Sequence, residues 1–175
     1  MIRPILTHPD PRLKKVCDHV PGVDEAVRAL MADMLQTMYE APGIGLAAPQ
    51  VGATSRILVM DCSKGEDEPP EPICMANPEI VWSSAELSEH EEGCLSIPDV
   101  FANVTRPAAV RVRFLDRDGA AQERDFDGLR ATCVQHEIDH LNGKLFIDYL
   151  SAMRRQMITA KMKKLKRERA RAAIL

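Results

Sequence analysis

The sequence has no apolar run that approaches the length of a membrane-spanning helix. Such a helix needs about 20 consecutive apolar residues. The 175 residues are 45% hydrophobic and 28% charged, the composition of an ordinary soluble globular protein. The first residues, MIRPILTHPDPRL, also lack the apolar core of a secretory signal. These absences exclude an integral membrane protein, and we expect a cytoplasmic one.

A disulfide pattern is missing from the sequence. The five cysteines, at positions 17, 62, 74, 94 and 133, are odd in number and irregularly spaced. A disulfide framework has an even number of cysteines, and it belongs to oxidising compartments. The sequence therefore suits a reducing compartment, where each cysteine is buried, reactive or bound to a metal ion.

Basic residues are concentrated at the C-terminal end. The formal net charge is −3, but residues 151–175 contain nine Lys or Arg and one acid, a charge of +8, which leaves −11 for the rest. The C-terminal segment therefore has a net charge opposite to that of the rest of the chain.

Apolar residues at helical spacing predict three helices in a single domain covering residues 1–175. The first covers 24–40 and ends before Pro42 and Gly43. The second covers 129–142, and Gly143 suits the left-handed position after a helix. Ser151 can cap the third, a basic helix over about 151–172. Its narrow apolar stripe consists of Met153, Met157, Ile158, Met162 and Leu165.

Strand signals dominate the middle of the chain. Residues 43–52 predict a shaped loop leading into a strand at 56–61, and 63–72 predict a solvated surface loop. Further strands are predicted at 73–77, 80–87, 109–115 and 120–126, with a turn at 116–119. This region is therefore expected to form antiparallel β structure.

An HExxH motif lies on the second predicted helix. His136 and His140 are four residues apart, so their imidazoles lie one turn above each other and can bind one ion. Glu137 then lies beside a water bound to that ion. A chance occurrence on an amphipathic helix is far less frequent than a metal site, but the motif needs a third ligand.

The residues alone leave that third ligand open. There is no histidine after His140, so the ligand lies upstream or is a carboxylate. Cys94 follows Gly93, which permits close backbone approach, although an isolated cysteine is more often a buried structural residue. His90 is another candidate, and Cys133 is as consistent with a core role as with lining a pocket.

Three motifs occur in order: GIGLAAPQ at 43–50, EGCLS at 92–96 and QHEIDH at 135–140. With HPDPRL near the start and HLNGKLFID after the last motif, the whole chain closely resembles the bacterial peptide deformylases. The resemblance implies an α+β fold, with antiparallel β-sheets around a central helix that bears HExxH. It also implies that Cys94, His136 and His140 hold one divalent ion, typically Fe2+, with Ni2+, Co2+ or Zn2+ as substitutes.

The implied reaction removes the N-formyl group from the methionine of newly synthesised polypeptides and releases formate. The ion lowers the pKa of a water, Glu137 takes its proton, and the hydroxide attacks the formyl carbon. By resemblance, the Gln50 side-chain amide and the Leu95 backbone N–H stabilise the oxyanion. Losing one such donor typically costs about 3 to 4 kcal/mol. Glu137 then protonates the leaving amine.

The resemblance also assigns substrate contacts. Ile44, Leu129 and Cys133 are expected to line an apolar pocket for the methionine side chain. The remaining expected contacts are Gly43, Gly45, Glu92 and Gly93, with the glycines letting backbone pass close to an extended peptide. A plain turn is the alternative for Gly45, and it predicts no loss of activity in Gly45→Ala.

Three positions depart from the family pattern. His90 and Thr132 replace residues that are often apolar, so the preference of the methionine pocket is open. Phe101 stands where some relatives have arginine, so we assign no substrate contact there.

The basic tail predicts a solvated helix face, an RNA-contacting helix or a membrane-surface helix. Its stripe lacks aromatic anchors, which disfavours the membrane. By resemblance we expect it to dock on the ribosome, without reading a nucleic-acid sequence. Two other functions compete: a metallopeptidase that cuts internal peptide bonds, and a non-catalytic ribosome-associated module whose metal site is closed by His90.

Overall fold

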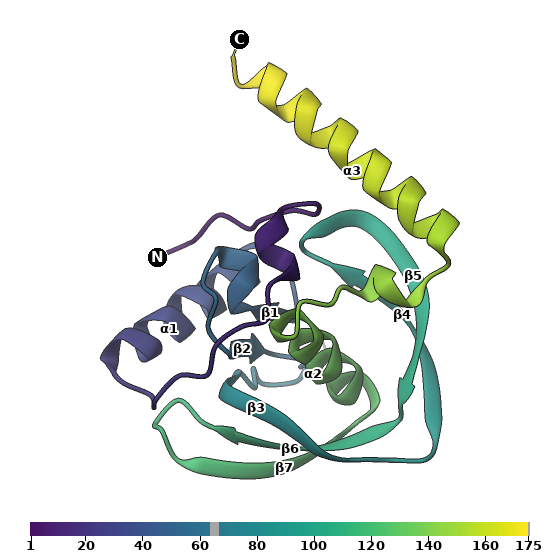
Figure 1. Ribbon diagram of the computed structural model, residues 1–175. Coiled ribbons are helices and arrows are strands. Elements are labelled where there is room, and N and C mark those ends of the chain that lie inside the picture. The colour runs from purple at the N-terminus through teal and green to yellow at the C-terminus, as the bar shows by residue number, and fades with distance from the viewer. Residues whose placement is uncertain (64–66, 175) are drawn as a thin grey trace.

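The computed structural model describes residues 1–63 and 67–174, and these residues form an α+β fold, as predicted. One antiparallel sheet has five strands in the order β1-β2-β3-β6-β7, and a second sheet pairs β4 with β5. The strands are β1 Gly45–Ala47, β2 Ile57–Met60, β3 Ile73–Ser83, β4 Leu87–Cys94, β5 Ile97–Pro107, β6 Ala109–Leu115 and β7 Ala121–Asp127. The helices are α1 Glu25–Glu40, α2 Gly128–Leu141 and α3 Ala152–Ala172, with short 3-10 helices at Pro11–Lys14, Ala48–Val51 and Phe146–Tyr149. Helix α2 lies at the centre, with strands around it (Figure 1).

Strand β2 is buried on both faces, between the two helices α1 and α2. Leu58 and Met60 belong to the core cluster that contains the apolar residues of α2. Ile57 and Val59 point the other way and pack with the methionines of α1. Burial on both faces explains why the ILVM sequence lacks the polar alternation of a half-exposed strand.

Helix α1 confirms the predicted first helix. The Asp24 side chain accepts a hydrogen bond from the Val27 N–H at 2.8 Å, which satisfies one of the free donors of the first turn. Met31, Met34 and Met38, at i, i+3 and i+7, are buried against the sheet. The helix therefore closes one face of the five-stranded sheet.

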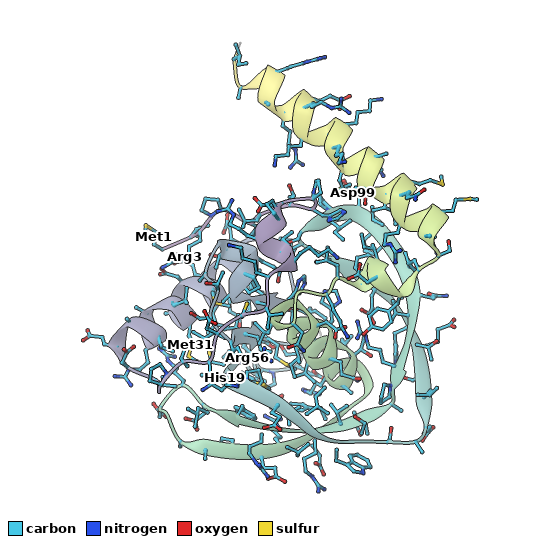
Figure 2. The ribbon with its side chains drawn as sticks, in the orientation of Figure 1. Met1, Arg3, His19, Met31, Arg56 and Asp99 are labelled. Atoms are coloured by element: carbon cyan, nitrogen blue, oxygen red, sulfur yellow. The ribbon has the colours of Figure 1, made fainter. Side chains whose placement is uncertain are left out.

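The C-terminal end of α2 is fixed by two contacts. Gly143 has φ +74°, and a Cβ there would lie 2.5 Å from the Lys14 carbonyl oxygen, so both conformation and space require glycine. Arg56, labelled in Figure 2, donates to the Leu141 carbonyl oxygen at 3.2 Å and to the Asn142 Oδ1 at 3.0 Å. A cation at a helix C-terminus is favourable, so Arg56 helps to hold the motif helix in place.

The middle of the chain differs from the sequence prediction. The predicted loop at 43–52 contains β1 and a 3-10 helix, and the strands predicted at 73–77 and 80–87 are one strand, β3, that ends at Ser83. Neither strand of the second sheet, β4 or β5, was predicted. Within the predicted surface loop, Glu71 forms ion pairs with Arg124 and Arg130, while residues 64–66 lie outside the described residues.

Helix α3 follows the predicted cap but not the full predicted stripe. Ser151 Oγ accepts from the Arg154 N–H at 3.3 Å. Ile158 and Met162 are buried in a core cluster with Phe146, whereas Met153 and Met157 are 73% and 67% exposed. The helix therefore uses one narrow face, and its C-terminal part projects from the body (Figure 1). None of the helices in the described part of the chain is long and apolar enough to cross a membrane.

Candidate metal centre

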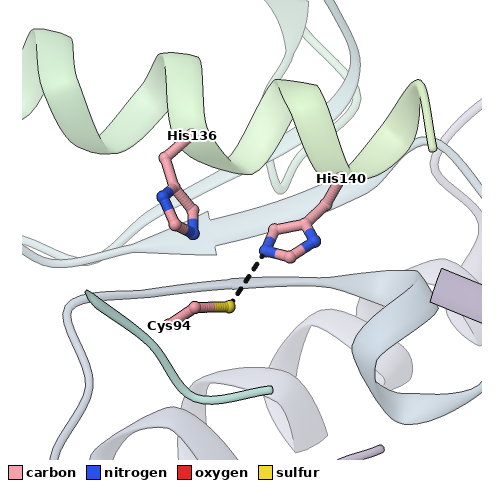
Figure 3. Close-up of side chains that lie close together, drawn as sticks. All are labelled: Cys94, His136 and His140. Carbon is pink, nitrogen blue, oxygen red and sulfur yellow. Dashed lines mark hydrogen bonds between the residues drawn. The ribbon is translucent and has the colours of Figure 1, made fainter. Parts of the chain in front are cut away.

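Helix α2 and the end of β4 bring together the three predicted ligands. The side-chain ligand atoms of Cys94, His136 and His140 all lie within 4.8 Å of one another. Figure 3 shows both imidazoles extending from one side of α2 towards the Cys94 sulfur, and the distance from Cys94 Sγ to His140 Nε2 is 3.4 Å. Both histidines are buried. The spacing of the motif and the bend after β4 therefore produce one compact site.

The donor chemistry of this site fits a divalent metal ion. One sulfur and two imidazole nitrogens form a set that binds such ions and leaves a coordination position open. Glu92 Oε1 lies 2.9 Å from Nδ1 of His136, which leaves Nε2 for the ion. His140 Nδ1 and Glu137 Oε2 are buried without a hydrogen-bond partner among the described residues.

The two imidazoles have different electrostatic surroundings. Burial, the nearby His136 and the Arg106 charge hold the pKa of His140 well below its usual value. Burial also lowers the pKa of His136, but hydrogen bonds with Cys94 and Glu92 outweigh it, and the pKa is raised. His140 is therefore held neutral, the form in which an imidazole binds a metal.

A buried ion-pair network contacts His136 through its Nδ1 atom. Arg106 donates to both oxygens of Glu92, at 2.7 and 2.9 Å, and to Asp139 Oδ2 at 2.8 Å. Tyr149 also donates to Asp139 Oδ2 at 2.8 Å. Burial raises the pKa of Glu92, but its bonds to Arg106 and His136 outweigh burial and lower it. Such partners fix the orientation of a metal-binding histidine.

This network adds residues that the sequence did not reveal. Glu92 is 5% exposed and its oxygens bond to Arg106 and His136, an arrangement that the sequence did not predict, while its expected contact with substrate stays a prediction. Arg106 and Tyr149 lie far from the motifs in sequence, and only Asp139 falls inside one. A charged residue at an inward position of β5 is the signal that points to Arg106.

Glu137 lies beside the ligands in a dry environment. Burial is the main cause that raises the pKa of Glu137 to about 7, and the Glu92 charge adds to it against the opposing effect of His136. Gly45 passes directly over this carboxyl group: a Cβ at Gly45 would lie 2.6 Å from Glu137 Oε1 and 2.9 Å from Cys133 Sγ. Only glycine leaves room for the carboxyl group here.

Gln50 points its side-chain amide at the same centre. Its Oε1 accepts from the Ala47 N–H at 2.9 Å, and its Nε2 donates to Ser96 Oγ at 3.0 Å and to Cys94 Sγ at 3.6 Å. Leu95 lies in the turn that directly follows Cys94, and its side chain packs against Gly43. Both predicted oxyanion donors therefore adjoin Cys94. Ser96, which orients Gln50, was not predicted.

The predicted pocket residues lie along one side of α2. Leu129, Cys133 and Glu137 are spaced by four residues, so they share a helix face, and Leu129 and Cys133 pack in the same core cluster. The Cys133 thiol donates to the Ile44 carbonyl oxygen at 3.6 Å. This hydrogen bond connects the helix face to the backbone just before β1.

The three positions that depart from the family pattern, His90, Phe101 and Thr132, lie outside the ligand set. His90 is on β4 opposite Val104, and the candidate cluster among the described residues consists of Cys94, His136 and His140 without it. The Phe101 ring covers Gly93, where a Cβ would lie 2.6 Å from the ring, and the side chain is 59% exposed. Thr132, the third departure, is buried.

The α+β fold and the Cys-His-His centre beside a buried carboxyl group define a candidate metal-dependent hydrolase. The polypeptide deformylase family model matches residues 2–156, and the chain belongs to this enzyme family. A peptide deformylase from Methylocella silvestris is 57% identical over 93% of this chain and 84% of its own length. The structure of a peptide deformylase from Ehrlichia chaffeensis has a TM-score of 0.92 at 40% identity and covers 97% of this chain and 99% of that one. A Met-Ala-Ser-bound class I type b peptide deformylase from Acinetobacter baumannii has a TM-score of 0.80 at 35% identity, over 86% of this chain and 99% of that one.

Proposed function

We propose that the whole chain is one catalytic domain that removes the N-formyl group from the N-terminal methionine of new polypeptides and releases formate. The observation that supports this most directly is the convergence of Cys94, His136 and His140 with Glu137 and Gln50. A formyl group is small, so a site closed in by Gln50, Leu95 and Glu137 can admit it and exclude larger acyl groups.

In the proposed reaction, Cys94, His136 and His140 hold the ion, and the Glu92 and Arg106 pair keeps His136 in position. When bound, the ion polarises oxygen ligands and lowers the pKa of water. Glu137 accepts a proton from the attacking water and then gives it to the departing amine nitrogen. The Gln50 Nε2–H and the Leu95 N–H stabilise the oxygen on which negative charge develops.

The substrate backbone is proposed to run between two strand edges. β1 is the end strand of the five-stranded sheet, and β4 is one of only two strands in the other sheet, so each has an unpaired edge. Gly43, Gly45 and Gly93 add no side chains of their own near these edges. An extended peptide can add to such edges by backbone hydrogen bonds, with the methionine side chain beside Ile44, Leu129 and Cys133.

We propose Fe2+ as the natural ion, on the family resemblance, because the sulfur and imidazole donors also accept Ni2+, Co2+ and Zn2+. We also propose that the protein works in the cytoplasm and contacts the ribosome through α3. The exposed basic residues of α3 and its projection from the body support an electrostatic contact with RNA phosphates (Figure 1).

The function is tested by assaying formyl-Met-Ala-Ser and unblocked Met-Ala-Ser side by side. We expect formate from the first peptide and no cleavage of either peptide's internal bonds. Glu137→Gln should lower kcat by about 100-fold to 10,000-fold while the metal content stays the same, because it removes only the proton transfer. Internal cleavage would indicate a peptidase instead, and unchanged turnover in the variant would refute the role of Glu137.

A further inference from the structure

Two buried thiols face each other beside the proposed methionine pocket. Cys62 lies two residues after β2 and is 4% exposed, and Cys133 on α2 is 5% exposed. Both belong to the core cluster between the sheet and α2. Each thiol shifts the pKa of the other, so the two side chains lie within interaction distance. Neither thiol belongs to the candidate metal cluster.

Backbone contacts hold these two cysteines close to each other. The Ile44 carbonyl oxygen accepts from the Asp61 N–H at 2.9 Å and from the Cys133 thiol at 3.6 Å. Cys62 directly follows Asp61, so a single carbonyl group ties both segments together. The pairing is therefore built into the fold and does not depend on two mobile surface side chains.

The two thiols differ in their tendency to ionise. The hydrogen bond with Cys133 and the Arg130 charge lower the pKa of Cys62 against the opposing effect of burial. The hydrogen bond with Cys62, burial and the Glu137 charge raise the pKa of Cys133 well above its usual value. A thiolate is the reactive form of cysteine, so Cys62 is the sulfur that reacts first.

We propose that Cys62 and Cys133 form a reversible oxidation site, in which hydrogen peroxide converts the two thiols into a disulfide. The Cys62 sulfur attacks one peroxide oxygen, the O–O bond breaks, and a sulfenic acid and one water form. The Cys133 sulfur then attacks the Cys62 sulfur, and the hydroxyl group leaves with the Cys133 proton as a second water. Two thiols and one peroxide give one disulfide and two waters, and the two electrons pass from sulfur to oxygen.

The disulfide would act on the proposed active site. Cys133 lies one turn before Glu137, and its thiol bonds to Ile44 and lies under Gly45. Drawing this sulfur towards Cys62 removes the bond to Ile44 and shifts the wall that receives the methionine side chain. We expect formate release to fall by about 100-fold, the cost of displacing such a wall by about 1 Å. This consequence rests on the proposed function, whereas the disulfide itself does not.

The test oxidises the full-length metal-loaded protein with hydrogen peroxide, alkylates the remaining thiols and maps the peptides by mass spectrometry. We expect one cross-linked pair that joins the Cys62 and Cys133 peptides and lacks two hydrogen atoms. Dithiothreitol should restore both thiols and formate release together. If both cysteines remain fully alkylated after oxidation, the proposal is wrong.

Two single variants separate this site from damage at Cys94. Cys62→Ala should keep basal formate release. After peroxide treatment, any activity that this variant loses should not return when dithiothreitol is added. Cys74→Ala, which changes another buried cysteine, should behave like the unaltered protein. A dithiothreitol-reversible loss in Cys62→Ala would overturn the proposal. A chain that forms the cross-link yet never releases formate would instead contradict the proposed function alone.

Discussion

The two helices α2 and α3 differ in how much of their surface is buried, and each is proposed to have a different role. In α2 ten of 14 residues are buried, and they include the polar residues His136, Glu137 and His140. In α3 the buried residues among its 21 are Ile158 and Met162, and most of its Lys and Arg side chains are exposed. Burial fixes the position of a side chain and alters its pKa, whereas exposure leaves its charge available to a partner.

The largest effect on the difference between α2 and α3 is expected from removing the Glu92 carboxylate, which supports His136 of α2. Glu92→Ala leaves Arg106 buried without its main partner, which should lower the free energy of unfolding by about 3 to 5 kcal/mol. Metal affinity should also fall by about 10-fold to 100-fold, because His136 loses the partner of Nδ1. Denaturant unfolding and metal titration measure both effects. The adjacent exposed Glu91, changed to alanine, is the control, and equal behaviour of the two variants would contradict the account.

The close approach of β1 to α2 is tested by adding one methyl group. Gly45→Ala places a Cβ against Glu137 Oε1, so kcat/KM for formyl-Met-Ala-Ser should fall by about 100-fold with metal content unchanged. Gly22→Ala is a matched control, because a Cβ there has no neighbour within 4 Å. Activity of Gly45→Ala equal to that of the control would show that this segment is only a turn.

The attachment of α3 is tested with two adjacent residues. Ile158→Ala removes a buried side chain from the cluster around Phe146 and should cost about 2 kcal/mol of stability. Met157→Ala changes a side chain that is 67% exposed and should stay within about 0.5 kcal/mol. Thermal and denaturant unfolding compare them. If the two costs are similar, α3 does not pack on the body through one face.

The smallest effect on catalysis is expected from the outer charges of α3. Replacing Lys164, Arg167 and Arg171 by glutamine should leave formate release and stability unchanged, because all three are exposed. If the helix contacts ribosomal RNA, each lost phosphate contact should reduce the salt dependence of ribosome binding by about 0.9 in the log–log slope. An unchanged slope would remove α3 from that contact. These substitutions are preferable to deleting α3, which would expose Ile158 and Met162.

Much of the helical structure follows from the sequence, because periodicity and caps act locally. Asp24, Ser151 and Gly143 mark helix ends correctly. Strands β4 and β5 escape prediction because β4 is mostly polar, while in β5 an outward Phe101 and an inward Arg106 obscure the apolar alternation. The predicted stripe of α3 includes too many residues: Ile158 and Met162 are buried and Leu165 packs beside them, whereas Met153 and Met157 are exposed. Periodicity does not show where along the helix the contact with the body begins.

Sequence predicts part of the candidate site and misses the rest, as it does for the fold. The motifs predict Cys94, His136, His140, Glu137 and Gln50, and the structure places these five residues around one point. The residues that orient them were missed, since Arg106, Tyr149 and Ser96 meet their partners only after folding. Glu92 was recognised as part of the site, but its bonds to Arg106 and His136 were not predicted, because sequence does not show which way a side chain points.

The most direct test of the account is X-ray absorption spectroscopy at the metal edge, on protein loaded anaerobically and active in formate release. We predict one ion per chain with one sulfur ligand and two nitrogen ligands. In zinc-substituted protein the sulfur should lie at about 2.3 Å and the nitrogens at about 2.0 to 2.1 Å. Cys94→Ser should lose the sulfur signal. A shell without sulfur, or with a third imidazole, would contradict it.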